Sequence, residues 1–242
     1  TSTLGSDQKS AVSNVAAVEI YGASQPVFSN LLQGATYDFG DVPTALDGSA
    51  TAPHGTISYQ WYQDGQPVSG AVQAAYAPPT DAEGSHEYYV VATNTVGTDV
   101  ASAQSNTATI TVYGAEAPTF TAALSGAEYD VGDQASALDG TATAARGTIS
   151  YQWYCNGQPV SNGTAAQYTP DTEEAGVFTY YVVATNTVGT SQKSATSETV
   201  TVTVYGASQP VFTAEPKSAA YIQNDPALAL SAQAYAERGT VA

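Results

Sequence analysis

The sequence is poor in sulfur-containing residues and in positive charge. It has one cysteine, no methionine, and five Lys or Arg residues against 22 Asp or Glu, which gives a formal net charge of −17 at pH 7. Such an excess of negative charge repels phosphate groups, so nucleic acids and anionic membrane surfaces are excluded as partners. The single cysteine excludes a disulfide within the chain. This composition fits exposure to an oxidising, extracellular environment.

Helix-period segments and long apolar runs are also missing. No run is long enough to cross a bilayer, so we expect no direct membrane insertion in this segment. Apolar and polar residues instead alternate with a period of two, as in residues 57–62, 107–112 and 200–204. Turn signals such as Asp64-Gly65 and Asn156-Gly157 separate these runs. The pattern predicts short strands in an all-β fold.

The chain repeats itself every 92 residues. Tyr21, Tyr113 and Tyr205 each begin the segment Tyr-Gly-Ala, and Trp61 corresponds to Trp153. Because each copy is the size of a domain, we expect a beads-on-a-string array rather than a solenoid. The predicted parts are a partial repeat that carries the C-terminal strands of a preceding copy (residues 1–20), two full repeats (21–112 and 113–204), and the N-terminal strands of a following copy (205–242).

The residues around each tryptophan carry a family resemblance. Tyr59-Gln60-Trp61-Tyr62, followed by an Asp-Gly turn, resembles strand C of an immunoglobulin-like (Ig-like) domain, and residues 88–94 followed by Gly97 resemble its strand F and F–G turn. The whole chain resembles the Cys-free Ig-like repeats of large Gram-positive bacterial surface or secreted proteins. The resemblance implies an all-β fold of tandem Ig-like antiparallel β-sandwiches in an extended array.

This resemblance also assigns structural roles. Val90 and Val182 occupy the strand F position where other members carry a cysteine, and the strand B partner of Val90 falls at Gly48 or Ala50. Trp61 and Trp153 are expected to anchor the two cores. Tyr88 and Tyr180 are expected to make the hydrogen bond of the tyrosine corner. No catalytic chemistry is expected of these tryptophans and tyrosines.

Signals for enzymatic chemistry are poor. The two histidines, His54 and His86, do not recur, because Arg146 and Phe178 occupy the corresponding positions of the next copy. A catalytic repeat is expected to keep its acid, base or metal ligand in every copy. We therefore predict no enzyme activity, no catalytic residue and no cofactor-binding residue. Cys155 stands where the first copy has Gln63, and we interpret it as an incidental substitution.

Calcium is the only cofactor for which the sequence offers candidate ligands. Asp38 and Asp41 recur as Asp130 and Asp133, in a turn that the Ig topology places at the C-terminal end of each repeat. A hard cation needs several oxygens converging on one point. The dense ligand strings of known calcium motifs are missing, so we favour turn capping and solvation for these acids.

Two further sets of residues are candidate interaction sites. Arg146 and Arg238 lie in the turn that faces the preceding copy, so we predict contacts with the acids of the neighbouring repeat, Arg146 with Asp38, Asp41 or Glu83. Outward-facing tyrosines of the C–F–G sheet are expected to recur as Tyr62, Tyr89, Tyr154 and Tyr181. These rings are suited to stacking on a sugar or docking a protein strand. Ordinary strand propensity is the simpler interpretation of the tyrosines, and we favour it.

The function predicted from these features is structural. We expect a stalk or spacer in a bacterial cell-surface or secreted protein that presents a distal functional domain, with neighbouring repeats of the same chain as its partners. One alternative is an adhesin whose repeats bind a glycan or a host surface protein through the C–F–G face. Others are accessory domains of an extracellular carbohydrate-active enzyme, or the repeat unit of a surface filament.

Overall fold

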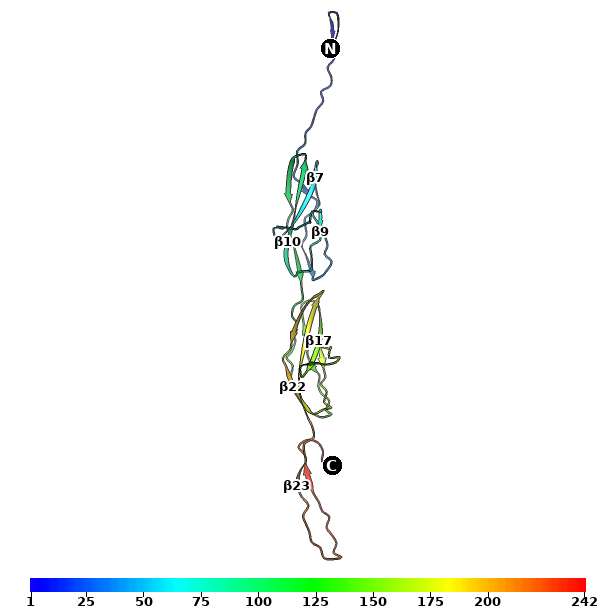
Figure 1. Cartoon of the computed structure of the whole chain (residues 1–242), viewed down its shortest axis with the longest axis vertical. Coiled ribbons are helices and arrows are strands. Elements are labelled where there is room, and N and C mark those ends of the chain that lie inside the picture. Colours follow the sequence, from blue (N-terminus) through cyan, green and yellow to red (C-terminus); the bar gives the residue numbers. More distant parts are fainter. The chain divides into compact units, whose positions relative to one another are not determined.

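The computed structural model describes residues 1–242 and consists of strands, turns and loops (Figure 1). It contains no helix that is long and apolar enough to cross a membrane. In the first half of the chain the strands are β1 (Ser2–Leu4), β2 (Asp7–Lys9), β3 (Val27–Phe28), β4 (Ala35–Asp38), β5 (Leu46–Asp47), β6 (Ala50–Thr51), β7 (Thr56–Gln63), β8 (Gln66–Pro67), β9 (Ala75–Tyr76), β10 (Gly84–Val96), β11 (Asp99–Gln104) and β12 (Ala108–Tyr113). In the second half they are β13 (Thr119–Phe120), β14 (Ala127–Asp130), β15 (Leu138–Asp139), β16 (Ala142–Thr143), β17 (Thr148–Cys155), β18 (Gln158–Pro159), β19 (Gln167–Tyr168), β20 (Gly176–Val188), β21 (Ser191–Thr196), β22 (Val200–Tyr205), β23 (Val211–Ala214) and β24 (Gln233–Tyr235).

The chain divides into two units. The first contains residues 1–37 and 41–112, and the second contains residues 38–40 and 113–242. Apart from Asp38 and Tyr113, the end residues of β4 and β12, which belong to the second unit, each unit holds one complete set of strands, β3–β12 or β13–β22. The two sets have the same order and the same strand lengths. The internal repeat of the sequence is therefore a repeat of local structure.

Each complete set of strands forms a sandwich with Ig-like strand order. In the first set the larger sheet runs β4-β12-β10-β7-β8, with β11 also paired to β10, while β3 pairs with β6 and β5 with β9. Within this unit β7 and β10 run side by side (Figure 1), with Trp61 opposite Val90 in the register. The second set repeats this arrangement as β14-β22-β20-β17-β18, β13-β16 and β15-β19. The expected all-β, Ig-like fold is confirmed.

One pairing differs from the expected antiparallel pattern. β14 runs parallel to β22, with Ala127 opposite Val202 and Asp130 opposite Tyr205. The start of the repeat is split: β13 pairs with β16, and the chain then crosses over so that β14 joins the larger sheet beside the last strand. A strand that crosses over in this way can meet its neighbour in the parallel direction.

Each sandwich has its own core around a tryptophan. Trp61 and Trp153 are fully buried, and the neighbouring core residues of the first sandwich include Leu46, Tyr88 and Val90. The Trp61 indole N–H donates a hydrogen bond to the Gln73 carbonyl at 2.9 Å, so its polar group is satisfied inside the core. Trp61 and Trp153 are thus the central core residues that the alternation of the C strand predicts.

The site of the missing disulfide is filled by a glycine and a valine. A Cβ built on Gly48 would lie 2.6 Å from Val90 Cγ1 and 3.0 Å from Trp61 Cζ2. Gly140 has the same relation to Val182 and Trp153 in the second sandwich. Of the two predicted partner positions, the structure places Gly48 opposite Val90, where the valine side chain occupies the space of the bridge.

A tyrosine inside β4 closes the turn that follows this strand. The Tyr37 hydroxyl accepts from the Thr44 backbone N–H at 3.0 Å, and Tyr129 and Tyr221 make the equivalent bond to residues 136 and 228 at 2.9 Å. Tyr88 is instead packed in the core next to Tyr76, and burial raises the pKa of Tyr88 to about 12. The bond of Tyr37 belongs to a different turn from the tyrosine corner, so the hydrogen-bonding role of Tyr88 and Tyr180 stays a prediction.

The flanking segments hold isolated hairpins. β1 pairs with β2, and β23 pairs with β24, with a register shift after Phe212. Apolar side chains in these segments are exposed, among them Leu4, Val18, Ile20 and Leu228. Val18 and Ile20 correspond to Ile110 and Val112 of the first complete copy, which are buried. Burial at these two positions therefore depends on a full set of strands.

Candidate functional site

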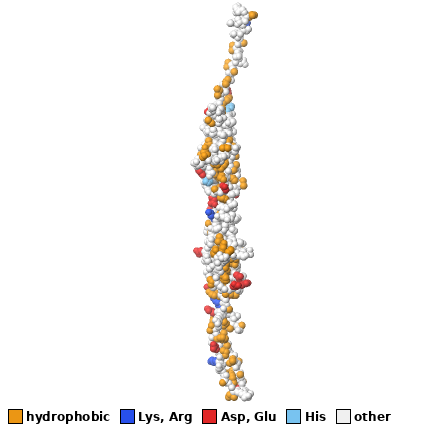
Figure 2. All heavy atoms as spheres, in the orientation of Figure 1, with side chains coloured by type: hydrophobic (Ala, Val, Ile, Leu, Met, Phe, Trp, Pro, Cys, Tyr) orange, Lys and Arg blue, Asp and Glu red, His pale blue; other side chains and the backbone are white.

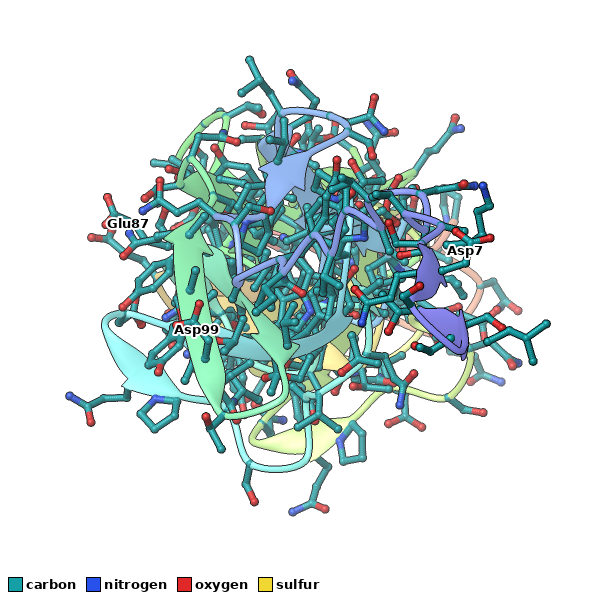
Figure 3. All side chains as sticks on the ribbon, turned by 90° about the horizontal axis from the view of Figure 1, so that it is seen from above. Asp7, Glu87 and Asp99 are labelled. Carbon is teal, nitrogen blue, oxygen red and sulfur yellow. The ribbon has the colours of Figure 1, made fainter.

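The Tyr-Gly-Ala segment that opens each repeat is fixed through its backbone. In the first copy the Ala23 N–H donates to Asp99 Oδ2 at 2.7 Å, and the Asn94 amide donates to the Ser24 carbonyl at 3.0 Å. Figure 3 labels Asp99 on the strand pair that supplies it, which is β10–β11. We call this arrangement the entry clamp.

The second copy keeps the entry clamp with one change of residue. The Ala115 N–H donates to Ser191 Oγ at 3.0 Å, and the Asn186 amide donates to the Glu116 carbonyl at 3.0 Å. Asn186 is fully buried, as is Asn94. Both asparagines fall on the inward face of the long F strand, because they follow Val90 and Ala92, or Val182 and Ala184, at a spacing of two. A buried amide held in this way fixes the path of the incoming chain.

Each buried asparagine also requires a glycine beside it. The side-chain oxygens of Asn94 and Asn186 have no hydrogen-bond partner. A Cβ on Gly55, whose φ is +103°, would lie 2.3 Å from Asn94 Oδ1, and Gly147 has the same relation to Asn186 at 2.4 Å. The hydrogen on the glycine Cα points toward this oxygen, so the contact is a weak C–H···O interaction that no other residue can make.

A cation lies over the tyrosine of the entry segment. The Arg146 guanidinium carbon is 4.2 Å from the centre of the Tyr113 ring, which is the range of a cation–π interaction. Arg146 Nη1 also donates to Asp38 Oδ1 at 3.0 Å. Asp38 and Phe39 belong to the same unit as Tyr113 and Arg146. We call this group of tyrosine, arginine and aspartate the cation site.

The next copy repeats the cation site. The Arg238 guanidinium carbon is 3.7 Å from the centre of the Tyr205 ring, and Arg238 Nη1 donates to Asp130 Oδ1. This hydrogen bond raises the pKa of Arg238 further above its ordinary value. The side chains of Arg238 and Asp130 stay partly exposed, at 38% and 52%. Salt therefore screens this ion pair, whereas the ring contact is less affected.

In the first full copy a histidine takes the place of the arginine. The His54 ring stacks on the Tyr21 ring, with 4.0 Å between the ring centres and 29° between the planes. The Tyr21 hydroxyl donates to Glu19, and this bond raises the pKa of Tyr21, with a smaller contribution from burial. The flat side chain at this position thus packs on the entry tyrosine in all three copies. The sequence carries this signal as a fixed spacing between each tyrosine and His54, Arg146 or Arg238.

The F–G turn of the second sandwich lies against residue 39. A Cβ built on Gly189, whose φ is +57°, would lie 1.8 Å from the Phe39 carbonyl oxygen. The equivalent Gly97, with φ +61°, has nothing within 4 Å of such a Cβ. The Phe39 N–H in turn donates to the Tyr113 carbonyl at 2.9 Å. The backbone of residues 38–40 is therefore held together with the entry segment and the cation site.

The acids that were considered for calcium are occupied in other ways. Asp133 Oδ2 accepts from the Asp130 N–H at 2.9 Å, as a turn cap does, and Asp130 and Asp38 bind the two arginines. Asp41 also has a partner. No three His, Cys, Asp or Glu side chains form a group that could hold a metal ion. The preference for turn capping over calcium binding at these acids stays a prediction.

The outward-facing tyrosines form stacked pairs. The Tyr62 and Tyr89 rings lie 4.9 Å apart with 5° between their planes, and the Tyr154 and Tyr181 rings lie 4.7 Å apart with 4° between theirs. The register places each pair directly opposite on neighbouring strands. Each ring therefore covers one face of the other, and a sugar would find only the outer face of each pair.

Comparison with known proteins gives structural neighbours only. No protein-family model and no curated protein matches the sequence. The similar solved structures include titin domains I67–I69 in an E-to-A mutated variant (16% identity, TM-score 0.36, 79% of this chain and 69% of that one) and the tandem Ig repeats of Dlar (18%, 0.31, 76% and 100%). Fibronectin(III)-like modules of CbhA from Clostridium thermocellum are also similar (13%, 0.29, 75% and 94%). Because the TM-scores of these three structures are below 0.5, the fold assignment rests on the strand order of the chain itself.

Proposed function

We propose that the chain is a structural spacer: tandem Ig-like repeats that carry a distal domain of an extracellular or cell-surface bacterial protein. The observation that carries this proposal is the recurrence of the cation site. Arg238 of the last copy binds Asp130 of the copy before it, and Arg146 binds Asp38 in the same way. Each of these ion pairs joins residues of two successive copies, so we infer that the cation site links the copies.

The backbone contacts support the same proposal. Each linker is a short Tyr-Gly-Ala segment without a flexible Gly/Ser tract, and in the second copy the entry clamp holds the Ala115 N–H and the Glu116 carbonyl. A linker that is held at both its backbone and its tyrosine ring has little conformational freedom left. We propose that successive repeats are thereby limited in bending, as a spacer requires.

The surface charge fits this role. Figure 2 shows acidic side chains scattered over the surface with few basic ones among them, consistent with 22 acids against five Lys or Arg. A high negative charge of one sign keeps an exposed array soluble and opposes association of chains side by side. The two arginines, Arg146 and Arg238, pair with aspartates in the cation sites. The charge distribution therefore gives no indication of a basic binding surface.

The spacer proposal predicts that a bulky residue at Gly189 loosens the array. We expect Gly189→Val to displace residue 39 from the F–G turn, because its Cβ would overlap the Phe39 carbonyl. The control is Gly97→Val, which carries the same positive-φ strain without a neighbour within 4 Å. Small-angle X-ray scattering of the whole chain should show a broader distribution of long intramolecular distances for Gly189→Val than for Gly97→Val and wild type.

Arg146→Gln provides an independent arm of this test. It removes the ring contact and the ion pair while leaving the F–G turn intact, so it should broaden the same distribution. Scattering profiles that do not differ among wild type, Gly97→Val, Gly189→Val and Arg146→Gln would contradict the spacer proposal. Unchanged urea unfolding midpoints would show that any broadening comes from the linker and not from loss of fold.

The adhesin alternative rests on the tyrosine pairs, which recur in both complete copies. A sugar platform needs ring faces that are open to the ligand. Here one face of each ring is covered by its partner at stacking distance. This geometry favours a structural role for the pairs, as cross-strand contacts that stabilise the sheet.

A further inference from the structure

The second sandwich contains a pocket of about 380 Å³ beside its core. Three aromatic side chains line it: Tyr168, Phe178 and Tyr180. Tyr180 is buried, while Tyr168 and Phe178 are half-buried and pack against the same core. The ring centres of Tyr168 and Tyr180 are 5.7 Å apart, with the planes tilted by 36°. Tyr180 is only 3% exposed and packs on Tyr168 inside the core, so the accessible aromatic surface of the pocket comes from Tyr168 and Phe178.

The rim of this pocket is acidic. Asp171, Glu173 and Glu174 line it, and all three are exposed. One oxygen of Asp171 accepts from the Glu173 N–H at 2.9 Å, and none of the three carboxylates takes part in the ion pairs of the structure. Asp171 also contributes to raising the pKa of Tyr168 and Tyr180, after larger effects of burial, of Cys155 and, for Tyr180, of Tyr168. The negative charge of Asp171 therefore acts on the tyrosine side chains that line the pocket.

We propose that this pocket binds a small organic ammonium ion whose nitrogen carries methyl groups. Such a cation is weakly hydrated, and it is attracted both by aromatic ring faces and by carboxylates at the rim. A primary ammonium ion is held more strongly by water and should bind less well. An anion is repelled by the three carboxylates, and a pocket of about 380 Å³ has room for a cation of the size of choline.

The first sandwich supplies a built-in comparison. Where the pocket has Glu174, Phe178 and Asp171, the first copy has Ala82, His86 and Pro79. His86 Nδ1 lies 2.6 Å from Asp64 Oδ2, so that ring is engaged in a polar contact. The corresponding place in the first copy thus lacks the aromatic ring of Phe178. Its acids differ in position, because Asp81 corresponds to Glu173, Glu83 to Ala175, and the Asp64 carboxylate contacts His86. Both places lie in the same protein, so its net charge acts on a thiol at either one.

The only thiol of the protein reports on this pocket. Cys155 lines it and neighbours Tyr180 across the strand pair. We therefore propose to measure the rate of Cys155 modification by a methanethiosulfonate that carries a trimethylammonium group and by one that carries a sulfonate. Each rate is divided by that of a small free thiol. The matched control is Gln63→Cys in a Cys155→Gln background, which moves the thiol to the corresponding place in the first copy.

We expect the ratio of cationic to anionic rates to be about threefold higher at Cys155 than at the thiol of the Gln63→Cys control, which is the order of one cation–π contact. Choline should slow the labelling of Cys155 saturably, and ethanolamine should slow it less. Glu174→Ala and Phe178→His, which introduce the residues of the first copy, should each reduce the difference. Equal ratios at the two thiols, or no protection by choline, would overturn the proposal. Tryptophan fluorescence confirms that each variant is folded before labelling.

This test is independent of the spacer proposal. The labelling rates depend on one pocket inside one sandwich, whereas the scattering test depends on the linkers. A pocket without affinity for choline would leave the spacer proposal as it stands, and loose linkers would leave the pocket proposal as it stands.

Discussion

Replacing Trp61 with alanine should unfold the first sandwich while the second stays folded. Trp61 is fully buried at the centre of its core, in contact with Tyr76 at 5.6 Å between ring centres. A substitution of this kind costs about 3–5 kcal/mol. It also leaves the Gln73 carbonyl without its donor, which costs about 1–3 kcal/mol when the group stays buried. The sum approaches the whole stability of a small domain, about 5–15 kcal/mol.

The second sandwich should be unaffected because its core is separate. The core cluster around Trp153 and the cluster around Trp61 share no residue. In the Trp61→Ala variant Trp153 is the only tryptophan, so its fluorescence follows the second sandwich alone. We expect its urea midpoint to match wild type, while far-UV circular dichroism shows about half of the strand signal lost before urea is added.

Two further variants make this prediction specific. Trp153→Ala should give the mirror result, with Trp61 fluorescence reporting an intact first sandwich. Trp61→Phe keeps a buried ring and loses only the indole N–H, so its loss of stability should be much smaller. A Trp61→Ala protein with a wild-type dichroism signal and a single transition at the wild-type midpoint would show that the tryptophan is not the anchor of its core.

The fold could be predicted because two patterns can be read directly from the sequence: the alternation of apolar and polar residues, and the 92-residue repeat. Alternation in residues 57–62 corresponds to β7, and the fixed 92-residue spacing requires the second copy to repeat it. The same alternation places Asn94 on the inward face with Val90 and Ala92. Its role in the entry clamp was missed because a polar residue in a strand is usually taken to face solvent. The inward spacing was the available signal.

Contacts between distant residues were harder to anticipate. Tyr37 and Tyr88 are both strand tyrosines, and only the folded turn decides that the Tyr37 hydroxyl reaches Thr44 while Tyr88 is buried. The Tyr113 ring and the Arg146 guanidinium are brought together by the path of the linker, which no short-range pattern encodes. The aromatic pocket was not predicted either, because residues from β17, β19 and β20 line it.

A disulfide between positions 48 and 90 should stabilise the first sandwich. The space for a Gly48 side chain is taken by Val90 Cγ1, so Gly48→Ala alone should overpack the core and cost about 1–3 kcal/mol. In the double variant Gly48→Cys, Val90→Cys, the sulfur at position 90 replaces that methyl group and lies within reach of one S–S bond. The closed loop spans roughly 40 residues, for which the chain-entropy model gives up to about 4 kcal/mol.

The measurement is the urea midpoint of the first sandwich, followed by Trp61 fluorescence in a Trp153→Phe, Cys155→Gln background so that no other thiol or tryptophan interferes. Oxidised protein should unfold at a higher midpoint than wild type, and the same protein after reduction at a lower one. The reduced form should still be more stable than Gly48→Ala, because Val90→Cys relieves part of the overlap. An oxidised form with no gain over the reduced form would mean that Gly48 and Val90 do not face each other as the disulfide position of this fold requires.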